Sequence, residues 1–262
     1  MKLLKIFYSV LKNNLINEFQ YKTQLYMKII NITLDVALAV ITVLIMFGKT
    51  GRLNTWKQEE VLILIGVYRI MVGLLNLFIK PSLASFTGSI KSGDFDYTLL
   101  LPVDAQFMSC IKTINIFNLA EIVFGIFYLM VLKTLFALHF DALGILGFGI
   151  TLVAGFITIV CLYSLVASLS FWFLDSSHLL IIFPQCIEWT GKWPISAFPE
   201  FFRIVFTYIV PVGLAITIPA EALLHKLELK SLGITVLISL ILMVVSRVVW
   251  KLGIKKYSGA SA

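Results

Sequence analysis

The chain is poor in charged residues and in the motifs of most enzymes. Only 13% of its 262 residues are charged, whereas a soluble domain carries about 25%. Its three cysteines and three histidines show no spacing typical of a metal site or a disulfide framework. No G-x-x-x-x-G-K-[ST] or H-E-x-x-H motif occurs, which argues against a phosphate-binding loop and a zinc protease. We therefore expect no catalytic residues, no metal site and no cofactor bound by this chain.

Long apolar runs dominate what is present. The chain is 60% hydrophobic, with a mean hydropathy of +0.98, and a bilayer-spanning helix needs about 20 apolar residues. These runs predict an all-α membrane protein with six transmembrane helices, at residues 29–47, 61–80, 113–132, 143–173, 179–191 and 231–250. A net charge of +7 suits contact with the membrane lipids of an anionic leaflet. Because the basic residues are scattered among the spans, we expect no nucleic acid partner.

The N-terminal segment differs from the spans. Residues 1–28 begin with apolar side chains at helical spacing, while lysines and other polar side chains fall elsewhere around the helix. This pattern predicts an amphipathic helix lying in the membrane interface, followed by a single transmembrane domain over residues 29–262. Basic residues are more frequent in segments 1–28, 80–112 and 247–256 than in the segments between them. By the positive-inside rule, both termini are expected in the cytoplasm.

Residues 195–224 are ambiguous, because three prolines interrupt an apolar stretch of nearly spanning length. A straight helix is kinked at Pro211, where the ring removes a hydrogen bond and clashes with the preceding turn. Broken segments are tolerated at membrane depth when protein surrounds them. We expect a re-entrant helical hairpin on the outer side of the membrane, and a seventh span is the alternative.

The ionisable residues that stand out inside the predicted spans are Asp35, Arg69, Glu121 and Glu188. Charged groups are costly at mid-bilayer, so they usually face a partner or a water-filled path. One interpretation is structural pairing, of Arg69 with Asp35 or Glu121. The other is that unpaired carboxylates line a translocation path and favour cationic substrates. The sequence leaves both interpretations open.

Residues 81–106 form a compact charged segment between two long apolar runs. Pro81 is expected to end the preceding helix. After a turn allowed by Gly93, the sequence "DFDYTLLLP" fits a short helix with Asp94 near its start, where the helix dipole favours an anion. That helix is expected to end before Pro102. Two interpretations are open: a plain interfacial loop, or a docking surface for another protein.

Three stretches carry a resemblance to a known family. "IKSGDFDYTLLLPV" is similar to the family pattern I-x-x-G-x-[LF]-D-x-x-L-L-x-P. "WPISAFPEFFRIVFTYIVPVGLAITIPAEALL" resembles a YPISIYP start with a proline-containing continuation, and Trp193 stands where tyrosine is usual. The tail "WKLGIKKYSGASA" is similar to the family's W-x-x-G-L-[RK]-[RK]-Y ending. Taken in order, and over nearly the whole chain, the sequence resembles the ABC-2 type permease family.

The resemblance implies the membrane subunit of an ATP-driven exporter, with an N-terminal elbow helix, six spans and a re-entrant outer segment. It implies a coupling helix after the second span, docking on a separate ATPase subunit that binds ATP and Mg²⁺. A second permease subunit, identical or related, is the other implied partner, and the expected location is the cell membrane of a bacterium. The residues then expected to make coupling contacts are Gly93, Asp94, Phe95, Asp96, Leu100 and Pro102.

An ion-coupled secondary transporter is the alternative function, with Asp35, Glu121 or Glu188 as the proton site. Many such transporters are built from repeated halves with matching broken helices, and the sequence shows no such repeat. The charged loop at residues 81–106 also suits docking better than ion coupling. We therefore expect the exporter subunit.

Overall fold

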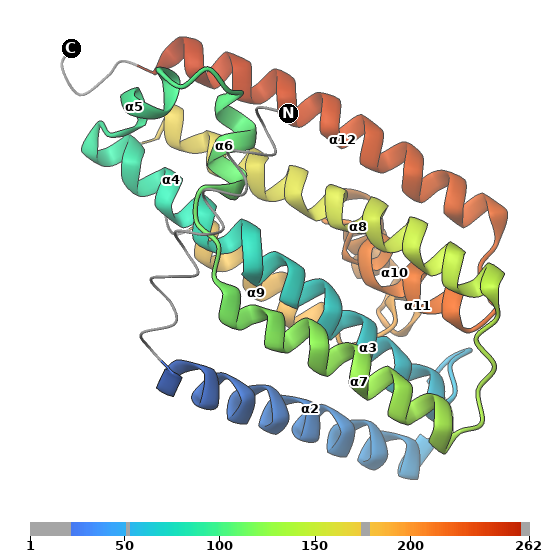
Figure 1. Ribbon diagram of the computed structural model, residues 1–262. Coiled ribbons are helices and arrows are strands. Elements are labelled where there is room, and N and C mark those ends of the chain that lie inside the picture. The colour runs from blue at the N-terminus through green and yellow to red at the C-terminus, as the bar shows by residue number, and fades with distance from the viewer. Residues whose placement is uncertain (1–21, 51–52, 174–178, 258–262) are drawn as a thin grey trace.

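The computed structural model describes residues 22–50, 53–173 and 179–257 (Figure 1). Long helices lie side by side in it, and within these ranges the only strand-like pairing is a single bridge between Leu53 and Trp56. An all-α fold is what the apolar runs predict, because a helix satisfies its backbone hydrogen bonds within one spanning segment. The predicted all-α fold is confirmed.

The helices follow one another with short connections. The first are α2 (Lys22–Thr50), α3 (Gln58–Leu74) and α4 (Lys80–Ser92). A turn of π-helix at Leu75–Ile79 joins the last two into one rod, residues 58–92, which is termed the central helix. The others are α5 (Phe95–Leu99), α6 (Ala105–Ile111), α7 (Leu119–Leu135), α8 (Ala142–Ser168), α9 (Leu179–Thr190), α10 (Glu200–Ile204), α11 (Ile218–Leu223) and α12 (Leu229–Lys256).

Several helices are long enough to cross a bilayer. In the described ranges, five are also apolar enough: Thr23–Lys49, Gln58–Ser92, Ile116–Leu135, Ala142–Phe171 and Leu229–Lys256. A sixth crossing results if the pair Glu200–Ile209 and Gly213–Leu223, bent by 77°, counts as one span. α9 covers the predicted fifth span with 12 residues, about 18 Å, which is short of the roughly 30 Å hydrocarbon core. The chain is therefore a multi-pass membrane protein.

Three expectations about segments of the chain are wrong or are tested only in part by the structure. Of the interfacial helix expected over residues 1–28, the part before Lys22 lies outside the described ranges, and the rest continues into α2 as one helix. Pro81 does not end a helix, because it is an early residue of α4. The segment 195–224 contains the bent pair, with Pro211 in the break. Its geometry fits a re-entrant hairpin and a broken span alike, so the domain boundaries stay predictions.

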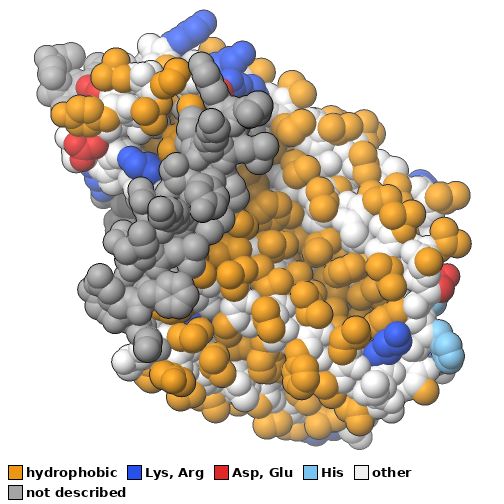
Figure 2. Space-filling model, viewed as in Figure 1, with side chains coloured by type: hydrophobic (Ala, Val, Ile, Leu, Met, Phe, Trp, Pro, Cys, Tyr) orange, Lys and Arg blue, Asp and Glu red, His pale blue; other side chains and the backbone are white. Residues whose placement is uncertain are grey.

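The central helix forms the core of the subunit. It packs against α2, α7, α8 and α11, and most of its apolar window is buried, whereas α2 and α12 expose most of theirs. The space-filling view shows hydrophobic side chains over the face that α7, α8 and α12 present (Figure 2). A soluble monomer rarely exposes so large an apolar surface. This surface matches the acyl chains of a bilayer.

A glycine lets α8 approach the bent pair closely. A Cβ built on Gly155 would lie 2.6 Å from the Cα of Ala215 and 3.0 Å from its carbonyl oxygen, and this backbone has little room to move aside. We expect Gly155→Ala to destabilise the protein by about 1–3 kcal/mol, the usual cost of overpacking. Gly149→Ala, on the same helix with no atom within 4 Å, is the matched control. Thermal unfolding of both variants tests this, and equal melting temperatures would contradict it.

Candidate functional site: an intramembrane polar ladder and an exposed loop helix

Three polar side chains follow one face of the central helix. Arg69, Asn76 and Lys80 are spaced seven and four residues apart, which brings side chains to the same side of a helix. The π-helical turn at Leu75–Ile79 falls inside this run, and such turns are frequent at functional sites. Each of the three contacts a carboxylate from a different helix. With their partners they are termed the polar ladder: Lys28, Asp35, Arg69, Asn76, Lys80, Glu121, Glu188 and Lys192.

The first rung of the ladder joins α2 to the central helix. The guanidinium of Arg69 forms an ion pair with Asp35, and the Nζ of Lys192 lies 2.8 Å from the other carboxylate oxygen. Both cations also face the ring of Tyr68, at 5.6 and 5.7 Å from its centroid, where an aromatic ring attracts a cation. Arg69 is only 5% exposed. The Asp35 carboxylate and the Tyr68 ring therefore offset the loss of water around a buried charge.

The second and third rungs lie farther along the central helix. Glu121 of α7 is 3% exposed. Its carboxylate lies 2.5 Å from the Nζ of Lys28 and accepts a hydrogen bond of 3.0 Å from the amide of Asn76. On the third rung, Lys80 donates to Glu188 of α9 at 2.8 Å. Pairing of this kind lowers the cost of holding charges inside a bilayer.

Most of the ladder lines a cavity of about 280 Å³ between α2, the central helix and α9. The sequence-predicted residues Asp35, Arg69, Glu121 and Glu188 are all part of its lining. Among the eight described members of the ladder, three carboxylates face four cations, and each carboxylate has a basic partner. The structure thus shows ion pairs, and a translocation path along the cavity stays a prediction.

The second candidate site is the loop after the central helix, at the end of the molecule where α12 also ends (Figure 1). Gly93 ends α4 with a φ of 82°, in the left-handed region that glycine adopts at little cost. The hydroxyl of Ser92 donates to Asp94 at 2.6 Å. Beyond this turn, Tyr97 on α5 and Leu100 directly after it are 72% and 81% exposed. The loop therefore presents apolar side chains beside an acidic one.

A buried set of rings anchors this loop. Phe95 has no exposed surface, and its ring centroid lies 5.3 Å from that of Phe86 on α4 and 5.4 Å from that of Tyr257 beyond α12. Phe171, after α8, and Trp250, on α12, complete this aromatic anchor, with centroids 5.3 Å apart. Edge-to-face ring pairs add stability beyond their buried area. The loop is thereby tied to the ends of three long helices.

The six predicted coupling residues differ in their exposure, and therefore in whether a partner protein can contact them. Exposed are Asp94, Leu100 and Pro102, and half-buried are Gly93 and Asp96. These five can lie against a partner, at least in part. Phe95 is enclosed by the aromatic anchor, so a role for it in coupling is internal to the subunit.

Comparison with protein families identifies the kind of protein. Residues 33–261 match the model of a family described as ABC-2 family transporter protein, a stretch that includes every described helix apart from the start of α2. The chain belongs to the ABC-2 family. None of the curated proteins compared with it is a match. The resemblance carried by three stretches of the sequence is confirmed, and this ABC-2 protein is a transmembrane permease of the ABC transporter type.

Sequence reasoning identified Arg69 but missed the three lysines of the polar ladder in this ABC-2 protein. Lys28, Lys80 and Lys192 stand at or just beyond the ends of the predicted spans, where lysines are usually solvated. Lys192 stands two residues beyond the end of α9 and donates to Asp35 at 2.8 Å. The spacing of Arg69 and Lys80 on one helix face was the available signal. It would have predicted cations aligned along one helix, although not their partners.

Proposed function

We propose that this ABC-2 protein is the membrane-spanning subunit of an ATP-driven exporter whose ATPase is a separate chain. The observation that carries the proposal is the loop after the central helix, where exposed apolar side chains stand on a buried aromatic anchor. A contiguous apolar patch on a rigid base is typical of a protein–protein contact. Membership of a transporter family supports the role in transport.

The ATPase is proposed to dock on α5. Tyr97, Leu99 and Leu100 are exposed there and suit an apolar groove that receives a short helix. Asp94 adds a carboxylate for a basic residue of the partner. ATP and Mg²⁺ are assigned to the ATPase, because the sequence of this chain has no phosphate-binding loop.

A movement of α5 would be transmitted to the spanning helices by two connections, one covalent and one through packed side chains. The central helix has 35 residues, about 52 Å, and leads from the loop to the polar ladder. The aromatic anchor adds a second connection, because Phe171 and Trp250 lie at the ends of α8 and α12. Closure of the ATPase around ATP is therefore proposed to tilt these helices together and to change the spacing of the ladder.

The proposal also includes the orientation of the chain in the membrane and a second permease subunit. α12 ends at the end of the molecule that carries α5, and α2 begins about level with the start of α7, on the side nearer that end (Figure 1). α12 carries Lys255 and Lys256 in its last turn. The positive-inside rule favours this end, with both termini, in the cytoplasm, beneath a cell membrane. A facing permease, identical or related, would supply the other wall of the route, since the ladder of one subunit holds only a small cavity.

An ion-coupled transporter needs a carboxylate that is free to take up and release a proton. Asp35, Glu121 and Glu188 each form an ion pair with a basic partner within the described residues, so none of the three stands as an unpaired carboxylate there. This arrangement supports the ATP-driven proposal over the alternative.

Purification of the tagged chain from its native membrane, with mass determination of the intact complex, tests the proposed function. We expect an ATPase with a phosphate-binding loop to accompany the permease, and ATP to drive transport in vesicles that contain an ionophore. Transport that stops when the ionophore collapses the ion gradients, and that needs no ATP, would contradict the proposal.

A further inference from the structure

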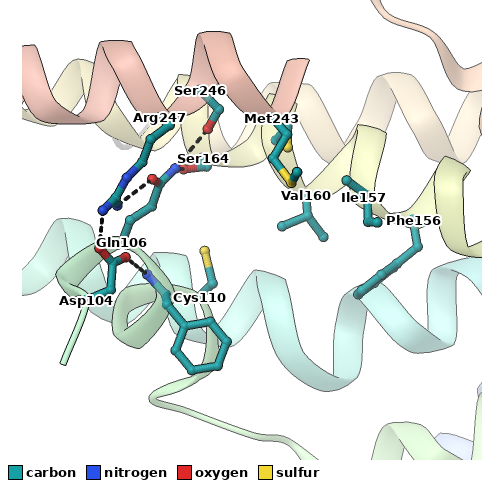
Figure 3. Close-up of a pocket in the computed structure, with 12 residues that line it drawn as sticks. Asp104, Gln106, Cys110, Phe156, Ile157, Val160, Ser164, Met243, Ser246 and Arg247 are labelled. Carbon is teal, nitrogen blue, oxygen red and sulfur yellow. Dashed lines mark hydrogen bonds and ion pairs between the residues drawn. The ribbon is translucent and has the colours of Figure 1, made fainter. Parts of the chain in front are cut away.

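A groove between α6, α8 and α12 lies apart from the polar ladder and the docking loop. It has a volume of about 550 Å³, and its lining comes from these helices and the turn before α6. In Figure 3, the polar side chains gather at one end, around Asp104 and Arg247, while Val160, Ile157 and Phe156 line the rest. The transport mechanism proposed above makes no use of this groove.

The polar end of the groove is organised by one glutamine. The side-chain amide of Gln106 donates to the hydroxyls of Ser164 on α8 and Ser246 on α12, at 3.0 and 2.9 Å. Its oxygen accepts a hydrogen bond of 3.1 Å from Arg247, which also forms an ion pair with Asp104. Partial burial opposes ionisation of Asp104, but the Arg247 hydrogen bond and backbone N–H groups hold its pKa below the usual value. Arg247 is therefore held by a charged partner.

The guanidinium of Arg247 has more N–H donors than these two contacts use. A guanidinium has five N–H donors in a planar fork, and the contacts with Gln106 and Asp104 engage two of its nitrogens. The side chain is 41% exposed. Lys251 lies one turn farther along the same helix and is also exposed. This end of the groove therefore favours an anion, and the planar fork suits the oxygens of a phosphate.

The rest of the groove is apolar and extends into the spanning part of the protein. From Ser164 to Phe156, α8 rises about 12 Å, and Met243 of α12 lies across from this stretch (Figure 3). Neighbouring side chains such as Val153 and Val244 are exposed on the membrane-facing surface of α8 and α12. An apolar chain entering the groove from the bilayer would stay in hydrocarbon surroundings throughout.

We propose that this groove binds one anionic glycerophospholipid of the leaflet that faces the docking loop. Its phosphate lies on Arg247 and Lys251, and one acyl chain lies along α8 and α12. The charge of the polar end selects the headgroup, and the apolar walls select a lipid over a free phosphate. A lipid bound here braces α6, which follows the docking loop, against two spanning helices.

Native mass spectrometry tests the proposal, with the protein purified together with the subunits that accompany it and titrated with phosphatidylglycerol. We expect one saturable lipid per chain, and Arg247→Gln is expected to weaken its binding about tenfold, through loss of charge-assisted hydrogen bonds. Lys230→Gln removes one positive charge from the opposite end of the same helix and is expected to leave binding unchanged. Glycerol phosphate, which has the headgroup without acyl chains, is expected not to compete.

A second variant leaves every charge in place, because Arg247→Gln also deprives Asp104 of its partner. Val160→Trp fills the apolar part of the groove and is expected to remove the saturable site. Leu143→Trp, at an exposed position near the start of the same helix and far from the groove-lining residues, is the matched control and is expected to retain it. A lipid stoichiometry and affinity that either Arg247→Gln or Val160→Trp leaves unchanged overturns the proposal, and so does equal competition by glycerol phosphate.

The N-terminal segment of the chain is a rival occupant of the groove, and cysteine cross-linking can detect it there. Cys110 lines the groove and is a free thiol. A cysteine placed at Leu11, in the apolar stripe predicted for the N-terminal segment, would form a disulfide with Cys110 only if that segment lies in the groove. Efficient cross-linking in native membranes would overturn the lipid proposal, whereas its absence, together with the saturable lipid, supports it.

Discussion

Replacing Leu100 with aspartate is expected to abolish ATP-driven transport while leaving the subunit folded. The Leu100 side chain, directly after α5, is 81% exposed, so its loss should change the free energy of unfolding by no more than about 0.5 kcal/mol. An apolar anchor at the centre of a docking contact is worth about 2 kcal/mol or more, and a charge placed there adds a desolvation cost. We therefore expect binding of the ATPase to weaken at least about thirtyfold. Co-purification of the two subunits and ATP-dependent transport in vesicles measure this.

A matched control separates docking from a general effect of the added charge. Leu229, 88% exposed at the start of α12, lies far from α5 along the same permease, and Leu229→Asp is expected to bind the ATPase and transport normally. Tyr97→Asp should reproduce the defect of Leu100→Asp, since Tyr97 is exposed on α5 itself. Normal ATP-driven transport by both Leu100→Asp and Tyr97→Asp would contradict the proposed docking of the ATPase on this loop.

The membrane-spanning architecture could be predicted because it depends on local composition. A span is recognised by about 20 consecutive apolar residues whatever it packs against. The predicted spans 29–47, 61–80 and 231–250 accordingly lie inside helices that are long enough to cross the bilayer. Pro81 shows where local reasoning failed. It follows the π-helical turn at Leu75–Ile79 and stands at the start of α4, where a missing N–H is tolerated, so the central helix continues to Ser92.

The candidate sites were predictable only in part, because they depend on which helices become neighbours. The sequence identifies Asp35, Arg69, Glu121 and Glu188 as costly charges, but tertiary packing decides which lysine each carboxylate meets: Lys192 at Asp35, Lys28 at Glu121 and Lys80 at Glu188. The same holds for the groove, whose polar end joins residues more than 50 positions apart in the sequence. Exposure within the loop also follows from packing, which encloses Phe95 and leaves Leu100 outside.

Asp35→Leu is expected to be among the most damaging substitutions in the membrane region. Asp35 forms ion pairs with both Arg69, which is 5% exposed, and Lys192. Without the carboxylate, the cations of Arg69 and Lys192 stay close together. Breaking a fully buried ion pair typically costs about 3–5 kcal/mol, and because the Asp35 side chain is 41% exposed we expect a loss of about 2–3 kcal/mol. Asp94→Leu removes an exposed carboxylate and should cost no more than about 0.5 kcal/mol. Thermal unfolding of the purified variants gives the comparison, and equal losses would contradict the importance of the pair.

A triple substitution distinguishes a structural role of this rung from a role in transport. Asp35→Leu combined with Arg69→Met and Lys192→Met removes all three of its charges, and replacing buried ion pairs by apolar side chains is often neutral for stability. We expect the triple variant to unfold near the temperature of the unsubstituted protein. We also expect its ATP-driven transport to stay low, because the cavity along the central helix loses three of its charged lining groups. Transport that returns together with stability would instead mean that the polar ladder only holds α2 against the central helix, and that the route lies elsewhere.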